Sequence, residues 1–223
     1  MEHHHDTQVL GKVAFFSSLA MLILIPLQIV IFAIKQPPQS AELWLALFGQ
    51  HWFLGLIEMD FLYIIDNSLV ALVYLALYHL LKEEKRALMQ IALLLGFLGI
   101  GAYYSSNPAF ELWEVQKQYA AATTAEAQQG WLIIANSLIL QWRGTAFNTY
   151  YILNGICLIM ISYALLKSHY PRKIGMIGLI SGLLMSIPST FGVIGVIFSL
   201  LSLIPWMLFL ALLLPHFKQM GKA

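Results

Sequence analysis

Six long apolar runs constrain this chain more than any other feature. A helix rises about 1.5 Å per residue, so a hydrocarbon core of about 30 Å needs roughly 20 apolar residues. Each run approaches that length, although Pro188 interrupts the fifth. We therefore predict an all-α polytopic membrane bundle of six transmembrane helices, forming one domain over residues 1–223. The predicted spans cover about 13–34, 59–81, 87–104, 144–166, 174–191 and 193–214.

The basic residues favour one orientation of these spans. Cytoplasmic loops of membrane proteins carry an excess of Lys and Arg. Nine of the twelve Lys and Arg fall on the side that holds both termini, and three fall on the other. We therefore expect both termini in the cytoplasm. The nine are Lys12, Lys82, Lys85, Arg86, Lys167, Arg172, Lys173, Lys218 and Lys222.

Composition agrees with a membrane protein. Hydrophobic residues make up 60% of the chain and charged residues 10%, whereas soluble domains have about 45–50% and 25%. A net charge of +1 gives no reason to expect a nucleic-acid partner, and the single cysteine, Cys157, cannot form an internal disulfide. The first apolar run is longer than the 7–15-residue core of a signal peptide, so we expect no cleavable signal. Residues 3–5 are histidines, either native or from a tag, and carry no functional argument.

The 105–143 connection predicts an outer helical cap. Asn107 before Pro108 is a favourable helix start, which predicts a helix to about residue 121. Thr123 and Glu126 then have the spacing of a capping box, which predicts a second helix.

Other outer segments predict helices at the membrane surface. Residues 42–50 indicate a short interfacial helix. The apolar run 131–140 is too short to span, so we expect it to lie in the interface or to dip into the bundle. Five of the six tryptophans fall on this side, as an aromatic belt or as a lid over a ligand cavity. They are Trp44, Trp52, Trp113, Trp131 and Trp142.

The apolar run 52–81 is unusual because it carries acids. A carboxylate near the bilayer centre costs roughly 2.5–3.5 kcal/mol on insertion scales, so such acids usually face a bundle interior or a watery cavity. Two of the predicted spans each have a polar face. On the second span this face carries Asp60, Tyr63, Asn67, Tyr74 and Tyr78, with Asp66 beside it. On the fourth span it carries Asn148, Tyr151, Gly155 and Ser162, with Tyr150 and Asn154 adjacent.

If these two faces meet, they enclose a polar cavity toward the outer side. The alternative is plain hydrogen bonding between helices, which averages about 0.6 kcal/mol per contact in membranes. Asp66 is the strongest candidate, because it is the deepest acid and burial favours its neutral form. Glu58 and Asp60 belong near the outer boundary. The candidate ligand-binding residues are Asp60, Tyr63, Asp66, Asn67, Glu111, Asn148 and Tyr151.

Glu111 enters this set through a second acidic patch, formed with Asn107 and Glu114. Glu111 and Glu114 are three residues apart and share a helix face. With Glu58 and Asp60 they could bind a cation or an amine-bearing ligand. The alternative is a solvated face at a helix N-terminus, where acids are favourable without any ligand.

Two further patterns have structural explanations. His79, His169 and His216 fall near the cytoplasmic ends of three spans, where three histidines could ligate zinc. A wet interface explains them better, and we expect no metal, no cofactor and no catalytic residue. Gly178 and Gly182 lie four residues apart in the fifth span, a spacing typical of close helix packing, within the bundle or in a homodimer.

Several of these segments resemble a known family. The stretches 107–111 (NPAFE), 119–124 (YAAATT) and 144–147 (GTAF), with Pro188, Gly192, Gly195 and Pro205-Trp206, are similar to a bacterial membrane family known as domain-of-unknown-function family 4386. The resemblance implies a six-span protein of the bacterial cell membrane. It implies no catalytic residue.

The sequence leaves several functions open. The first is binding or sensing of a small apolar or amphipathic ligand in an outward-facing cavity. The second is proton- or cation-coupled transport with Asp66 as the coupling acid, which would require a homodimer to enlarge the path. The third is lipid modification by an intramembrane enzyme, against which stands the lack of a nucleophile or metal motif. A purely structural role needs no polar site.

Overall fold

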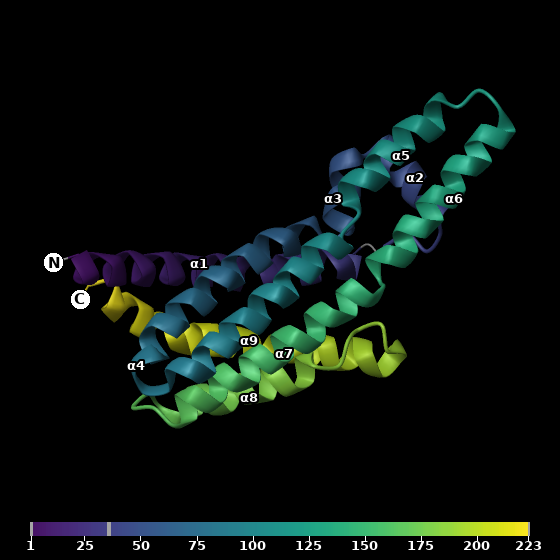
Figure 1. Ribbon diagram of the computed structural model, residues 1–223. Coiled ribbons are helices and arrows are strands. Elements are labelled where there is room, and N and C mark those ends of the chain that lie inside the picture. The colour runs from purple at the N-terminus through teal and green to yellow at the C-terminus, as the bar shows by residue number, and fades with distance from the viewer. Residues whose placement is uncertain (1, 35–36, 223) are drawn as a thin grey trace.

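Every regular element in the described part of the chain is an α-helix, which confirms the all-α class. The computed structural model describes residues 2–34 and 37–222, and only the backbone of residues 2–5. An elongated bundle carries a projecting arm made of α5 and α6 (Figure 1). The helices are α1 (Glu2–Ile34), α2 (Ala41–Gln50), α3 (Trp52–Glu58), α4 (Phe61–Ser106), α5 (Ala109–Ala121), α6 (Ala125–Trp142), α7 (Thr145–Leu166), α8 (Arg172–Met185) and α9 (Gly192–Met220).

Helix α4 is a hairpin that reverses at Lys85. Lys85 lies in a run of charged residues and has non-helical dihedral angles, φ −142° and ψ 46°. The hydroxyls of Ser68 and Tyr104, 36 residues apart in sequence, are 2.8 Å from each other. A straight helix would hold residues so far apart in sequence about 54 Å from one another. The arms 61–84 and 86–106 are therefore antiparallel, and they contain the second and third predicted spans.

The bundle helices close a ring. Helix α1 packs on α4, α4 on α7, α7 on α8, α8 on α9, and α9 returns to α1. Their inward faces share one hydrophobic core, which includes Tyr74 and Leu77 of α4, Leu158 of α7 and Phe209 of α9. This arrangement brings the second and fourth predicted spans together.

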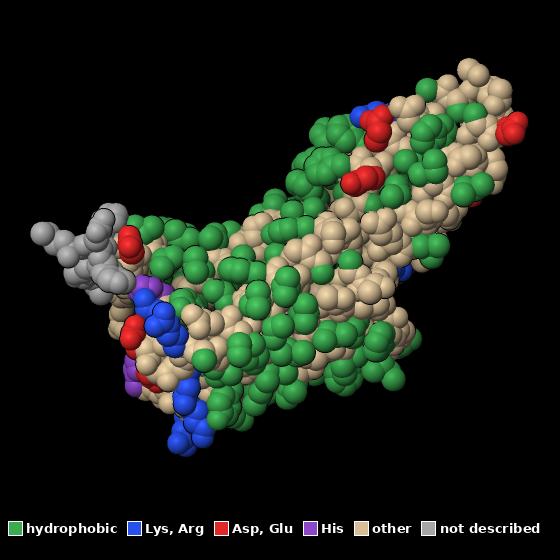
Figure 2. All heavy atoms as spheres, in the orientation of Figure 1, with side chains coloured by type: hydrophobic (Ala, Val, Ile, Leu, Met, Phe, Trp, Pro, Cys, Tyr) green, Lys and Arg blue, Asp and Glu red, His purple; other side chains and the backbone are tan. Residues whose placement is uncertain are grey.

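Four segments are long and apolar enough to cross a membrane, by length and composition. They are Asp6–Ile34, Phe61–Ala121, Ala125–Leu166 and Gly192–Met220. Large apolar side chains cover much of the visible bundle surface (Figure 2), and Val193 is 76% exposed. Soluble proteins rarely leave such continuous apolar surface open to water. The exterior of the bundle therefore suits a lipid environment.

Glycines let α7 and α8 approach closely. A Cβ atom added at Gly155 would lie 3.0 Å from the carbonyl oxygen of Gly182, and one added at Gly182 would lie 3.0 Å from that of Gly155. A Cβ atom at Gly178 would collide with the Ser162 hydroxyl oxygen. The small-residue row of the fifth predicted span therefore faces a neighbouring helix of the same chain.

The outer helices α2, α3, α5 and α6 form a second hydrophobic core, which includes Trp44, Phe48, Leu112 and Trp142. Trp44 and Trp142 meet edge to face, with ring centroids 5.7 Å apart. Such aromatic contacts contribute about 0.5–1.5 kcal/mol beyond area burial. This outer core packs the base of the projecting arm onto α2 and α3 (Figure 1).

The apolar run 52–81 is divided between two helices. Helix α3 ends at Glu58 and α4 begins at Phe61, because Asp60 adopts a left-handed conformation with φ 63°. The side-chain amide nitrogen of Asn107 donates to the Met59 carbonyl oxygen at 2.6 Å and holds this turn in place. The predicted second span therefore starts two residues late, after a turn that is set by contacts remote in sequence.

Other boundaries shift for local reasons. The fifth span was predicted to cover 174–191 with a kink or an early end at Pro188, and α8 does end early, at Met185. The capping box on Thr123 was wrong by one residue, because the Thr124 hydroxyl accepts the Ala127 N–H at 3.2 Å. The run 131–140 does not dip into the bundle. It belongs to α6, which packs on α5 and α2.

Candidate functional site

A cavity of about 230 Å³ lies within the ring of bundle helices. Its wall comes from α1, both arms of α4, α7, α8, the α8–α9 connection and α9. The polar residues of the wall are Asp60, Tyr63, Asp66, Tyr74, Tyr103, Tyr150, Tyr151, Asn154, Ser181, Ser189, Ser199 and Ser202. The apolar residues are Ile25, Phe32, Val70, Phe147, Leu158, Met185, Val196, Leu200, Leu203 and Trp206.

Four predicted site residues line this cavity: Asp60, Tyr63, Asp66 and Tyr151. A fifth, Asn67, lies behind the wall and is only 1% exposed. Its amide nitrogen donates to the carbonyl oxygen of Tyr63 at 2.8 Å, one turn earlier in α4. The α4 face that the sequence singled out therefore does meet α7, and Asn67 supports the wall without lining it.

The remaining two predicted residues lie elsewhere. Asn148 accepts a hydrogen bond from the Thr190 hydroxyl, which ties α7 to the α8–α9 connection. Glu111 is exposed on α5, away from the cavity lining. In the same acidic patch, Glu114 pairs with Lys117 at 3.0 Å. Asn107 of this patch bonds to the Met59 carbonyl oxygen, between Glu58 and Asp60, but Glu111 and Glu114 are not part of the cavity lining.

Asp60 is held by contacts from three elements. The indole nitrogen of Trp142 donates to its carboxylate oxygen Oδ2 at 3.1 Å, and the Tyr103 hydroxyl donates to its backbone oxygen at 3.4 Å. Arg143 is near enough to attract its carboxylate electrostatically. The left-handed backbone at Asp60 is one that Asp tolerates better than most residues. Asp60 therefore has partners that explain its burial structurally.

Asp66 differs from Asp60 in lacking such partners. It is 7% exposed, and its buried Oδ1 atom has no hydrogen-bond partner among the described residues. Across the wall, the side-chain oxygen of Asn154 is equally buried and equally without a partner there. Buried polar atoms are nearly always paired, and an unpaired one costs about 1–3 kcal/mol. Both oxygens therefore have capacity to accept a hydrogen bond from a donor group in the cavity.

Tyrosine rings form much of the remaining wall. The ring centroid of Tyr103 lies 6.5 Å from that of Tyr63 and 4.9 Å from that of Tyr150, and Tyr150 lies 5.4 Å from Tyr151. Sequence reasoning missed Tyr103, because it lies on the third predicted span and reaches the cavity only through the hairpin of α4. It also missed Ser181, Ser199 and Ser202, whose signal was polarity inside otherwise apolar spans.

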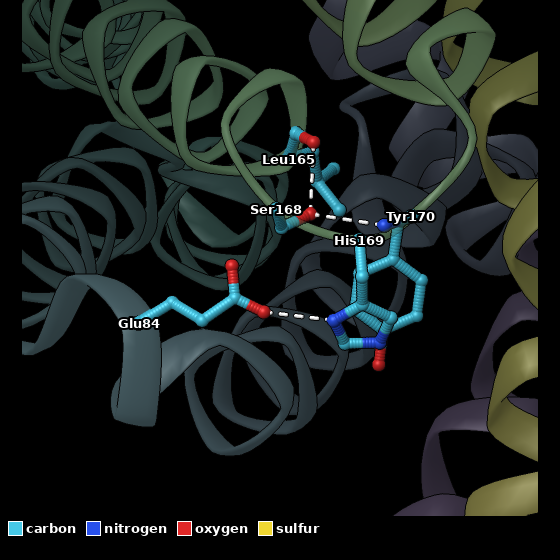
Figure 3. Close-up of polar contacts among 5 residues, drawn as sticks. All are labelled: Glu84, Leu165, Ser168, His169 and Tyr170. Carbon is cyan, nitrogen blue, oxygen red and sulfur yellow. Dashed lines mark hydrogen bonds and ion pairs between the residues drawn. The ribbon is translucent and has the colours of Figure 1, made fainter.

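A smaller polar cluster lies at the connection between α7 and α8 (Figure 3). The Nδ1 atom of His169 is 2.8 Å from the Glu84 carboxylate. The Ser168 hydroxyl donates to the Leu165 carbonyl oxygen and accepts from the Tyr170 N–H. Burial, and secondarily the Glu84 carboxylate, raises the pKa of the Tyr170 hydroxyl. These contacts order the connection between α7 and α8.

The three histidines considered for zinc do not form a shared site. His79 contacts Thr7 at 2.9 Å, His169 faces Glu84, and His216 packs edge to face on Tyr170 with ring centroids 5.1 Å apart. Over residues 6–34 and 37–222, no group of three or more His, Cys, Asp or Glu side chains is placed to hold a metal ion.

No protein-family model, curated protein or solved structure matches this chain. The functional argument therefore starts from the cavity and the charges around it.

Proposed function

We propose that this protein crosses the bacterial plasma membrane six times and binds or senses a small apolar or amphipathic molecule in an outward-facing pocket. The pocket is the cavity of about 230 Å³. The observation that carries this proposal is Asp66, a buried acid whose Oδ1 atom lacks a partner among the described residues while lining an open volume. Ligand sites are typically concave and mostly apolar, with a few convergent polar groups.

The six passes are α1, the two arms of α4, α7, α8 and α9. The start of α1, the end of α9, the reversal in α4 and the α7–α8 connection all lie at one end of the bundle (Figure 1). Lys and Arg side chains gather at that end (Figure 2), which supports a cytoplasmic location. Helix α8 has 14 residues and covers about 21 Å, so the connection that follows it would complete its crossing.

Cysteine accessibility tests this topology. Cys157 is buried and is the single cysteine, so Cys157→Ala provides a clean background. Into it we would introduce Glu83→Cys beside the α4 reversal or Gln129→Cys in the arm, both at exposed positions. A membrane-impermeant maleimide should label Gln129→Cys in intact cells and Glu83→Cys only after lysis. The opposite labelling pattern would overturn the orientation, and labelling of both in intact cells would overturn the six-pass arrangement.

A pocket-filling variant tests ligand binding. Ser199 lines the cavity, and its hydroxyl donates to the helix carbonyl oxygen of Val196 at 3.0 Å. Ser199→Phe should fill the cavity. Ser137→Phe is the matched control, because Ser137 bonds to its own helix in the same manner but is exposed on the arm.

Both variants and the wild type would be purified from the same membranes, and the small molecules that co-purify would be compared by mass spectrometry. We expect a species that accompanies the wild type and Ser137→Phe and is depleted at least tenfold in Ser199→Phe. Identical profiles for all three proteins, each folded and monodisperse, would contradict a ligand-binding pocket.

A second candidate function is proton- or cation-coupled transport, which the same buried acid favours. Ionisable groups in membrane interiors often belong to proton relays. In proteoliposomes, coupled flux should be abolished by Asp66→Asn and by Asp66→Leu. If both variants retain wild-type flux, the coupling role is excluded. A homodimer would enlarge the path through this small bundle, and its presence in nanodiscs is measurable by mass photometry.

Family membership is also part of the proposal. It is supported by the sequence similarity of 107–111, 119–124 and 144–147 to domain-of-unknown-function family 4386. If the similarity reflects shared function, substitutions in 144–147, which lead into α7 and contribute Phe147 to the cavity wall, should change ligand binding.

A further inference from the structure

We infer that the pocket accepts a primary ammonium group carried on a short apolar tail. This inference rests on the proposed function and specifies its ligand class. It follows from the hydrogen-bonding capacity of the wall, from its balance of charge, from its aromatic content and from its size.

The first argument concerns hydrogen bonds. The atoms of the cavity wall that are buried without a partner are Oδ1 of Asp66 and Oδ1 of Asn154, considering the residues that the structure describes. Both are acceptors, the amide oxygen always and the carboxylate oxygen whenever Asp66 is ionised. The Asn154 amide nitrogen already donates to the Tyr150 carbonyl oxygen at 3.3 Å. A ligand that satisfies them must donate, and a primary ammonium offers three N–H donors.

The second argument concerns charge. Within the described ranges, the wall of the cavity contains two carboxylates and no Lys, Arg or His side chain. Asp60 has Trp142 as a hydrogen-bond donor and Arg143 nearby. Among the described residues, Asp66 has no such donor on its Oδ1 atom and no cationic side chain that attracts it. A cation inside the pocket would compensate the one acid of the wall that the protein itself leaves uncompensated.

The third argument concerns the aromatic side chains. Tyrosine rings at 63, 103 and 150 follow one another along the wall at centroid distances of 4.9–6.5 Å. Tyr74 and Trp206 extend this lining further into the bundle. The faces of such rings attract cations by about 0.5–2 kcal/mol each, and sites for amines are often built in this way. A carboxylate among tyrosine rings therefore favours an ammonium group over a neutral polar group.

The fourth argument concerns the tail and its length. Ile25, Leu158 and Leu203 supply an apolar wall, and Val196 and Leu200 reach the outside of the bundle, with 45% and 54% exposure. This side suits a hydrocarbon tail. A volume of about 230 Å³ equals roughly seven or eight water molecules of about 30 Å³ each. An alkyl amine of about seven non-hydrogen atoms matches that size.

Three probes of equal chain length test the ligand class: hexylamine, 1-hexanol and hexyltrimethylammonium. An alkyl amine resembles the Lys side chain, with a pKa of about 10.4, and is charged at neutral pH. Binding would be measured by calorimetry with the full chain in zwitterionic nanodiscs, after subtraction of the heat with empty nanodiscs. We expect hexylamine to bind the wild type at least about tenfold more tightly than 1-hexanol, as for hydrogen bonds to a charged group. Hexyltrimethylammonium, which has no N–H donor, should bind more weakly than hexylamine.

Variants place the effect at the pocket. Asp66→Asn keeps the size of the side chain and removes its charge. It should therefore weaken the affinity for hexylamine at least about tenfold and change the affinity for 1-hexanol less than about threefold. Glu126→Gln, at an exposed acid in the first turn of α6, is the matched control and should change neither affinity. If Asp66→Asn does not fold, Asn154→Leu is the alternative variant. It removes the second acceptor and should weaken the affinity for hexylamine severalfold.

The outcomes separate this inference from the proposed function. Equal affinities for hexylamine and 1-hexanol, both lost in Ser199→Phe, would overturn the ammonium inference and leave the pocket standing. Tighter binding of the quaternary ammonium would also overturn it, because the unpaired oxygens would then have no role. If none of the probes binds and Ser199→Phe co-purifies with the same molecules as the wild type, both proposals fail.

Discussion

The contact between Asp60 and Trp142 joins the bundle to the outer helices, and its strength can be predicted. The Trp142 indole nitrogen donates to the Asp60 carboxylate at 3.1 Å across 82 residues of sequence, and both side chains are buried. Asp60 also holds the left-handed turn that separates α3 from α4. Replacing Asp60 by Ala removes the hydrogen bond and keeps a side chain in the left-handed conformation. Replacing it by Gly removes the hydrogen bond and relieves that conformation.

These two effects have separable magnitudes. A buried hydrogen bond contributes about 0.5–1.5 kcal/mol between neutral groups and about 1.5–3 kcal/mol to a charged group, so we expect about 1–3 kcal/mol here. A left-handed conformation costs a residue such as Ala about 1–2 kcal/mol, whereas Gly adopts it freely. Gly also makes the unfolded chain more flexible, at a cost of about 0.4–1 kcal/mol. Asp60→Gly should therefore be more stable than Asp60→Ala by about 0–1.6 kcal/mol, with a central value of about 0.8 kcal/mol.

A double-mutant cycle measures the hydrogen bond directly. Asp60→Ala, Trp142→Phe and the double variant would be unfolded reversibly in mixed micelles, with the free energy of unfolding as the readout. The packing lost with the indole ring cancels in the cycle, and we expect a coupling energy of about 1–3 kcal/mol. If the two substitutions add within about 0.5 kcal/mol, the hydrogen bond does not stabilise the fold. If Asp60→Gly is no more stable than Asp60→Ala, the left-handed turn is not a source of strain.

Three further predictions concern packing, capping and pH. Gly155→Ala should destabilise the bundle by about 0–2 kcal/mol, because an overpacking cost of about 1–3 kcal/mol exceeds a helix-propensity gain of about 1 kcal/mol. Gly101→Ala, whose Cβ would meet open space, should stabilise the bundle by about 0.5–1 kcal/mol. Chemical unfolding measures both effects, and equal effects would refute the close α7–α8 contact. Thr124→Ala should cost the first turn of α6 about 1 kcal/mol, seen as faster amide exchange there and unchanged exchange in the bundle. Hydrogen bonds from its own backbone and from Ser40 lower the pKa of Glu42 from its usual 4.5. The stability that ionised Glu42 adds to α2 is therefore present above pH 4.5 and is lost as the pH falls further. Amide-exchange protection of α2, corrected for the intrinsic pH dependence of exchange, should fall below pH 4.5 in the wild type but not in Glu42→Gln.

Much of the helical organisation was predictable because it depends on local patterns. Ser40 caps α2, and Asn107 accepts the Ala109 N–H at the start of α5, one residue from the predicted helix boundary. The short polar stretch around Lys85 predicted where the second and third spans separate. Helices form through hydrogen bonds four residues apart, and apolar length is a property of each segment alone. A single sequence therefore carries this information directly.

The candidate site was predictable only in part. The period of a helix places Asp60, Tyr63 and Asp66 near one face of the predicted second span, and all three line the cavity. The same reasoning grouped Glu111 with them, but no local rule relates the direction of α5 to that of α4. Glu111 lies in the arm, exposed and apart from the cavity lining.

By itself, the sequence determined which segments are helical, which are apolar and where acids interrupt them, because hydropathy and helix periodicity are local. The tertiary structure alone decided that Tyr103 approaches Asp60, 43 residues away in sequence. It also decided that Trp142 and Arg143 compensate Asp60, whereas the Oδ1 atom of Asp66 has no such partner among the described residues. The two acids look alike in the sequence. They differ because the energy of a buried charge depends on the groups that packing brings within a few ångströms of it.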